Sequence, residues 1–138
     1  MITKSDVLTD EYLEAELIDQ SQTLLCRSKK SYIPNQEFKD FFERLESVID
    51  ENNVTKLIFD KTSLSVFDQE AMEWYHIYWK EKMWAKGLKH HRKILPDNSL
   101  FETSVSIGRR KILEKNLDFS FDKFDIQYCS SVEEAMSK

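Results

Sequence analysis

The segment 57–71, LIFDKTSLSVFDQEA, constrains the fold of this chain more than any other part of the sequence. Residues 54–59 form an apolar run of strand length, as expected for a strand covered by helices. The run ends at Asp60, and a polar loop follows. Asp68 then stands where a residue that caps a helix would stand. Such a strand–loop–helix junction is typical of α/β proteins.

Length and composition favour one compact unit. A chain of 138 residues with 41% apolar and 33% charged content predicts a single globular domain. We expect that domain to span residues 10–138, after a flexible leader over residues 1–9. Cys26 and Cys129 fit reduced thiols in a cytoplasm better than a disulfide framework. The N-terminal stretch lacks the apolar core of a signal peptide, and no apolar run reaches the ~18 residues of a membrane span.

Charge and glycine content exclude several function classes. A net charge of −5 argues against a dedicated nucleic-acid binder. Only two glycines occur, which excludes glycine-rich phosphate loops, whose backbone must approach phosphate closely. No triad, nucleophile elbow or metal-ligand spacing is present, so we expect no enzyme activity, no cofactor and no metal site.

Periodicity predicts the order ββαβαβαβα. Residues 11–18 and 23–27 alternate as two strands of a hairpin, whereas apolar residues at spacings of three and four predict helices. Strands that alternate with helices imply a mostly parallel sheet, to which the hairpin adds an antiparallel edge. Later helices are expected at 35–53 and 68–86, and a short one after Ser131. A further helix is expected after a cap at Asp97, Asn98 or Ser99, with an apolar stripe from Phe101 to Ile112. The later strands are expected at 54–59, 88–95 and 124–128.

The junction resembles the STAS domain of anti-sigma factor antagonists, which pairs a strand ending in Asp with two apolar residues and an Asp at the start of a helix. The pattern is closest to a bacterial STAS/SEC14-like branch, mostly uncharacterised, and covers about residues 10–136. The matching residues are Leu57-Ile58-Phe59-Asp60, Val66-Phe67-Asp68, the aromatic helix from Glu73 to Trp79, Gly87-Leu88, Leu95-Pro96-Asp97 and Leu100-Phe101.

The chain departs from that family at its switch. The antagonists have Asp-Ser-Ser-Gly where this chain has Asp68-Gln69-Glu70-Ala71, so the phosphorylated serine falls on Glu70. Glu70 either mimics a phosphoserine or simply occupies a first helical turn, where the helix dipole favours an acid.

The loop between the two aspartates holds the remaining switch candidates. Thr62, Ser63 and Ser65 are either modification sites or residues that stabilise turns. Asp60 and Asp68 either form an acid pair that could hold a cation or have structural roles only.

The helix expected over residues 68–86 is apolar on two sides. Trp74, Ile77, Tyr78 and Trp84 occupy its back, so they need cover from a partner, a second copy, a ligand or another segment of the chain. A ligand pocket, if present, is expected beside Trp79 and Trp84, between this helix and the following strand.

The strand expected over residues 88–95 is basic. Lys89, His91, Arg92 and Lys93 form either an anion-binding patch or a solvated run of charges.

Two functions remain open from the sequence. The first is a non-catalytic, cytoplasmic regulatory module that acts through protein contacts, with a homodimer as one version. The second is a carrier or sensor of a small apolar or anionic ligand, which the SEC14-like resemblance implies.

Overall fold

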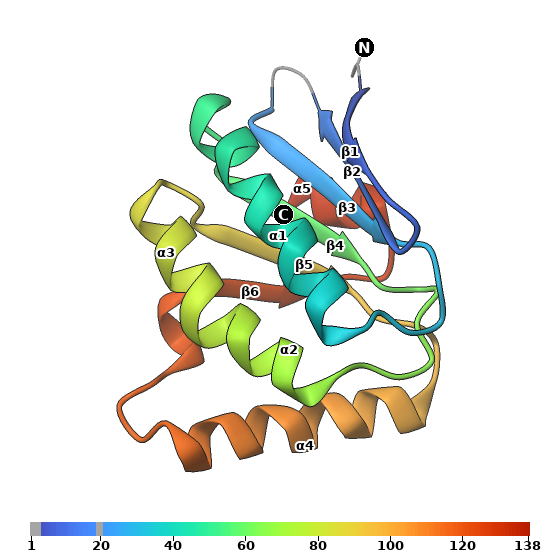
Figure 1. The fold of residues 1–138 in the computed structure, drawn as a ribbon, viewed down its shortest axis with the longest axis vertical. Helices are drawn as coiled ribbons and strands as arrows, with labels where there is room; N and C mark the ends of the chain where they lie inside the picture. The colour runs from blue at the N-terminus through green and yellow to red at the C-terminus, as the bar shows by residue number, and fades with distance from the viewer. Residues whose placement is uncertain (1–3, 19–20) are drawn as a thin grey trace.

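The computed structural model describes residues 4–18 and 21–138, which form a six-stranded sheet with helices on both faces (Figure 1). This confirms the expected α/β class. The strands are β1 (Lys4–Thr9), β2 (Leu13–Ile18), β3 (Thr23–Ser28), β4 (Lys56–Asp60), β5 (His90–Ile94) and β6 (Asp125–Tyr128). The helical elements are α1 (Asn35–Glu51), α2 (Gln69–Trp74), the π-helical η1 (Tyr75–Trp79), α3 (Lys80–Ala85), α4 (Ser99–Lys115), the short 3₁₀ turn η2 (Phe121–Lys123) and α5 (Val132–Ser137).

The strands lie in the sheet in their order along the chain, from β1 to β6. Strand β2 runs antiparallel to both of its neighbours, β1 and β3, whereas β3 to β6 are parallel. The predicted hairpin is confirmed as β2 and β3. The leader prediction is wrong for residues 4–9, because these form β1 and pair with β2. The first residues of this edge strand are polar, so the strand shows no apolar alternation in the sequence. Its main-chain pairing with β2 stabilises it instead.

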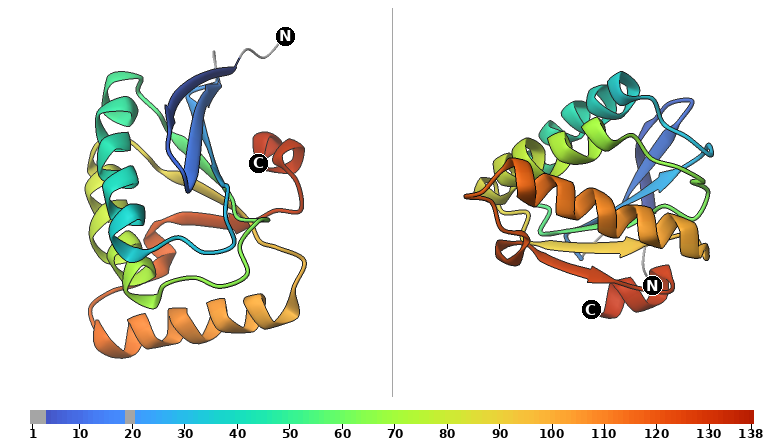
Figure 2. Two further views of the ribbon diagram at one scale, coloured as in Figure 1. Left: turned by 45° about the vertical axis from the view of Figure 1, so that its right-hand side comes forward. Right: turned by 90° about the horizontal axis from the view of Figure 1, so that it is seen from below.

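The helices divide unequally between the two faces of the sheet (Figure 2). Each parallel crossover carries its helices on one face, as successive right-handed crossovers in one direction require. That face covers the larger core, which includes Leu24, Phe42 and Phe59. Among the described elements, only α5 covers the opposite face, where it packs Ala135 against Ile58 and Ile94.

Helix α1 forms as its periodicity predicts. Its buried residues are Phe41, Phe42, Leu45 and Ile49, which form one stripe. Asn53, with φ of 51°, turns the chain away after the helix. The stripe packs against the aromatic helix that follows β4.

That aromatic helix is interrupted by a π-helical turn. Regular helix in α2 gives way to η1 and then resumes in α3. The wider turn lets Tyr75, His76, Trp79 and Lys80 all face the interior. Trp79 is fully covered, and its indole Nε1 donates a hydrogen bond of 2.8 Å to the Phe42 main-chain oxygen.

Candidate functional site

A small cavity of about 40 Å³ lies where β4 and β5 end, under the loop that leads into α2. In parallel sheets the carboxyl ends of the strands are the usual place for a ligand. The cavity is closed by α2 and η1 on one side and by α4 on another. Its walls are mostly apolar, formed by Ile33, Phe38, Phe59, Leu64, Val66, Phe67, Ala71, Met72, Tyr75, Leu95, Phe101 and Val105.

Four polar residues also line this cavity: Lys61, Asp68, His76 and Lys93. Asp68 is occupied by its own chain, since its Oδ1 accepts from the Ala71 amide at 2.9 Å and its Oδ2 from the Tyr32 hydroxyl at 3.0 Å. The other three present nitrogen atoms. The cavity is therefore an apolar space with a basic floor.

Two residues of this floor, His76 and Lys93, belong to a buried basic cluster, which we define as His76, Lys80, His91 and Lys93. Each side chain is at most 2% exposed. The Lys93 Nζ lies 3.2 Å from His76 Nε2. Lys80 Nζ, His76 Nδ1 and both ring nitrogens of His91 have no hydrogen-bond partner within the described part of the chain. Native proteins rarely leave buried polar groups unpartnered, so this cluster needs an explanation.

Acidic partners are missing from the basic cluster. Among residues 4–18 and 21–138, no carboxylate oxygen lies within 4 Å of the amine of Lys61, Lys80 or Lys93. Buried lysines are normally paired, because an isolated buried charge is costly. Here the three lysine amines lie near aromatic rings, and the Lys93 amine also lies near His76.

Burial and mutual repulsion lower the pKa values of these groups. Burial is the main cause of the lowered pKa of Lys93, and neighbouring Lys80 adds to it. The pKa of Lys80 falls well below its usual range for the same reasons, with Lys61 as the largest charged neighbour. Burial lowers the pKa of Lys61 to about 8, and it lowers the pKa values of His76 and His91 well below 6.5. Burial therefore shifts each of these amines and imidazoles toward its neutral form.

Tyr75 lines the cavity and lies beside two lysines of the basic cluster, Lys80 and Lys93. Its ring stacks on Trp79 with centroids 5.2 Å apart. The amines of Lys80 and Lys93 lie 5.0 and 5.9 Å from the Tyr75 ring centroid. A ring face at this range attracts a protonated amine, so Tyr75 offers partial support to either lysine when it carries charge.

Strand alternation explains why only part of the basic strand reaches the cavity. His91 and Lys93 pair with Leu57 and Phe59 of β4 and share their helix-covered face. Arg92 points to the opposite face. Lys89 lies before the strand, with its Nζ 3.1 Å from the Trp84 ring centroid. The four predicted residues therefore form neither one surface patch nor a solvated run, since three of them are buried.

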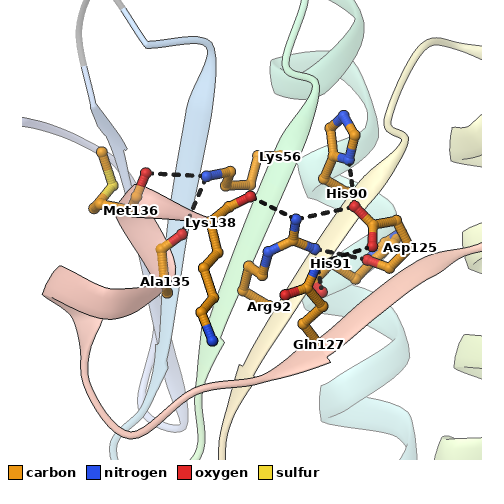
Figure 3. A network of polar contacts seen from close by, with 9 residues as sticks. All are labelled: Lys56, His90, His91, Arg92, Asp125, Gln127, Ala135, Met136 and Lys138. Atoms are coloured by element: carbon orange, nitrogen blue, oxygen red, sulfur yellow. Dashed lines mark hydrogen bonds and ion pairs between the residues drawn. The ribbon is translucent and has the colours of Figure 1, made fainter.

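Arg92 is held by its own chain (Figure 3). Its guanidinium donates to Asp125 Oδ2 at 2.9 Å and to the main-chain oxygen of Lys138 at 2.7 Å. His90 lies 2.7 Å from the same carboxylate oxygen, and its hydrogen bond, followed by those from Arg92 and Gln127, lowers the pKa of Asp125 to about 2. Beside it, Lys56 donates to the main-chain oxygens of Ala135 and Met136, both at 3.1 Å. These bonds fasten α5 to the sheet and leave Arg92 little capacity for an external anion.

The junction residues also have partners within the chain. Asp60 Oδ1 accepts from the amide and hydroxyl of Thr62, at 3.0 and 2.8 Å, and Ser63 Oγ lies 2.5 Å from Ser28 Oγ. Asp68 caps α2, as its position in the sequence predicts. Ser65 and Glu70 are exposed, and the nearest cation to Glu70 is Lys39, at 3.9 Å.

The predicted aromatic back of the helix is largely covered. Trp74 packs against Phe38 with ring centroids 6.4 Å apart, and Trp84 lies under the amines of Lys89 and Lys123. Ile77 is half-buried, whereas Tyr78 is 67% exposed. The enclosed cavity lies beside Tyr75 and His76, about one turn before the position predicted beside Trp79 and Trp84. A shallow surface groove does border Trp74, Tyr78 and Trp79.

Sequence reasoning missed the roles of Lys61, Tyr75 and Lys80. One signal for them is present in the sequence: His76 and Lys80 stand four residues apart among aromatic residues, on a helix face that has to be buried. Without the adjoining strand, nothing in the sequence shows that Lys93 meets them.

The chain matches no family model and no curated protein. In the part of the chain that the structure describes, no group of histidine, cysteine or acidic residues is arranged to hold a metal ion. No described helix has both the length and the apolar character needed to cross a membrane.

Proposed function

We propose that this chain is a non-catalytic binding module that holds a small carboxylate with an apolar body in the cavity at the end of β5. The supporting observation is the basic cluster, which lies beneath apolar walls and has no described acidic partner. A carboxylate that enters the cavity supplies the missing counter-charge, and the apolar walls receive the rest of the molecule. The amines take up protons as the anion arrives.

The size of the cavity limits the ligand. A buried water needs about 10–15 Å³ of such space, so about 40 Å³ accommodates a molecule of a few heavy atoms. Acetate and propionate are suitable probes. The loop 61–67 forms part of the cavity wall through Lys61, Leu64, Val66 and Phe67. A bound ligand therefore contacts this loop and can change its conformation at the protein surface.

The test compares propionate with propionamide, its uncharged isostere, in thermal unfolding at constant ionic strength. Propionate should stabilise the protein, by about 2.7 kcal/mol at a concentration of one hundred times Kd. Propionamide should not stabilise it. Lys93→Met should abolish the effect, whereas Lys111→Met, at an exposed position of α4, should keep it. Equal stabilisation by both compounds would reject the anion-binding role.

A second candidate is a STAS-like, cytoplasmic regulatory module that acts through protein contacts. Two exposed side chains favour it: Val66 in the loop is 55% exposed and Tyr78 is 67% exposed. Glu70 stands where the STAS domains of anti-sigma factor antagonists have the phosphorylated serine. Such a module would therefore signal without phosphorylation at position 70. Sedimentation at micromolar concentration tests the homodimer version. A clean monomer, unchanged by Tyr78→Ser, would reject that version.

A further inference from the structure

We propose that Lys93 captures the carbonyl group of a small oxo acid as a reversible imine inside the cavity. This inference rests on the proposed function, because it names the class of carboxylate that the same cavity takes. It adds covalent chemistry that the binding of a simple carboxylate does not need.

The position of Lys93 carries the inference. The side chain is 2% exposed, extends from β5 into the helix-covered face and lines the cavity. A lysine in a central strand usually has an acid beside it, but the nearest recorded partner of this amine is His76 Nε2, at 3.2 Å. The nucleophilic nitrogen therefore meets both an apolar space and an imidazole that can carry a proton.

The surroundings favour the reactive form of the amine. Burial, together with the amines of Lys80 and Lys61, lowers the pKa of Lys93 well below 10.5. Only an unprotonated amine attacks a carbonyl carbon, and a desolvated lysine beside a second cation is a known way to obtain one. Lys80 is such a neighbour whenever its own amine holds a proton, and its Nζ has no hydrogen-bond partner among the described residues.

The chemistry balances without any further reagent. The Nζ lone pair forms a bond to the carbonyl carbon, and an amine proton passes to the carbonyl oxygen, with His76 placed to relay it. The resulting carbinolamine loses its hydroxyl group, together with the second amine proton, as water. The products are one imine and one water molecule, and the addition of water reverses the reaction.

The other amine in the cavity wall selects an oxo acid over a simple aldehyde. Lys61 lines the same cavity from the loop after β4 and has no carboxylate within 4 Å in the described residues. It can hold the carboxylate while Lys93 reacts with the carbonyl. Glyoxylate and pyruvate carry both groups within a few heavy atoms, which suits this cavity.

The experiment incubates the full chain with pyruvate and cyanoborohydride, which reduces an imine to a stable secondary amine. Mass spectrometry should show one main adduct, equal to the mass of pyruvic acid less one oxygen atom. Peptide mapping should place it on Lys93, labelled at least about tenfold faster than the exposed Lys111. Excess propionate should suppress the Lys93 adduct, and prior unfolding in urea should remove the preference.

Two negative results are distinguishable. If Lys93 reacts no faster than Lys111 in folded wild-type protein while propionate still stabilises it more than propionamide does, the imine inference is wrong and the proposed function stands. If propionate also fails to stabilise the protein, both are wrong. Because the decisive comparison uses wild-type protein, it does not depend on Lys93→Arg folding. That variant should lose the adduct at position 93 if it folds.

Discussion

Replacing Lys61 by Met tests the claim that the cavity holds amines at an energetic cost. Lys61 is partly buried beside apolar walls, and its amine lies 4.8 Å from the Phe59 ring centroid. Methionine has a similar length and no charge. We expect Lys61→Met to be more stable than wild type at pH 7, the reverse of what most substitutions do.

The magnitude follows from the pKa of Lys61. A fall from 10.5 to about 8 is about 2.5 units, and at about 1.4 kcal/mol per unit it represents about 3.5 kcal/mol. Loss of the contact with the Phe59 ring removes about 0.5–1 kcal/mol. The expected net gain at pH 7 is therefore about 2.5–3 kcal/mol.

The gain should depend on pH with a defined sign. Below about pH 8 the amine is protonated in both folded and unfolded wild type, so the full penalty is present. Between about pH 8 and 10.5 the unfolded chain holds the proton and the folded chain does not, so wild-type stability rises with pH. The advantage of the variant should disappear over that range.

Urea unfolding, followed by tryptophan fluorescence at pH 7 and pH 10, measures this difference. Lys111→Met is the control, and it should match wild type at both values. The reasoning would be refuted if Lys61→Met were no more stable than wild type at pH 7, or if it kept its full advantage at pH 10.

Further substitutions and a binding measurement test other parts of the structure. Gly108→Ala should lower the free energy of unfolding by about 1–2 kcal/mol, because the added Cβ would lie 2.6 Å from Gln69 Oε1 and 3.0 Å from Met72 Sδ. The matched control is Ser106→Ala, at an exposed position of the same helix. Asp68→Ala should cost about 1 kcal/mol in urea unfolding through loss of the α2 cap, whereas Asp68→Asn should retain most of it. A bound carboxylate should raise the pKa of Lys61 from about 8, so the protein should take up protons as propionate binds at about pH 8.5. Calorimetry in buffers of different ionisation enthalpy measures this uptake, because the observed binding enthalpy should then change from buffer to buffer. The same enthalpy in every buffer would contradict the prediction.

The overall fold was predictable because its signals are local and strong. The apolar run before Asp60, the Phe41–Ile49 stripe and the caps at Asp68 and Ser131 each determine an element without distant information. The alternating residues of β2 and β3 likewise predicted the hairpin. Strand β1 escaped prediction because main-chain pairing with β2 stabilises it, rather than a strong pattern of its own.

The candidate site was predictable only in part. The sequence indicated a ligand between the aromatic helix and the basic strand, but it placed the pocket one turn too late. No local signal in the sequence marks the π-helical turn at Tyr75–Trp79. The basic strand also looked suited to solvent, because five cationic or imidazole side chains in a row, at residues 89–93, rarely lie in a core. Its burial depends on α4, α5 and β6, which come later in the chain.

The most direct test of the binding claim is a methyl NMR titration of the protein with propionate. The Met72 side chain lines the cavity, whereas Met136 packs on the opposite face of the sheet and serves as an internal reference. We expect the Met72 methyl resonance to shift with propionate until the site is saturated and not to shift with propionamide. The Met136 resonance should stay unchanged in both titrations. A Met72 resonance that stays in place as propionate rises, or that moves together with Met136, would contradict it.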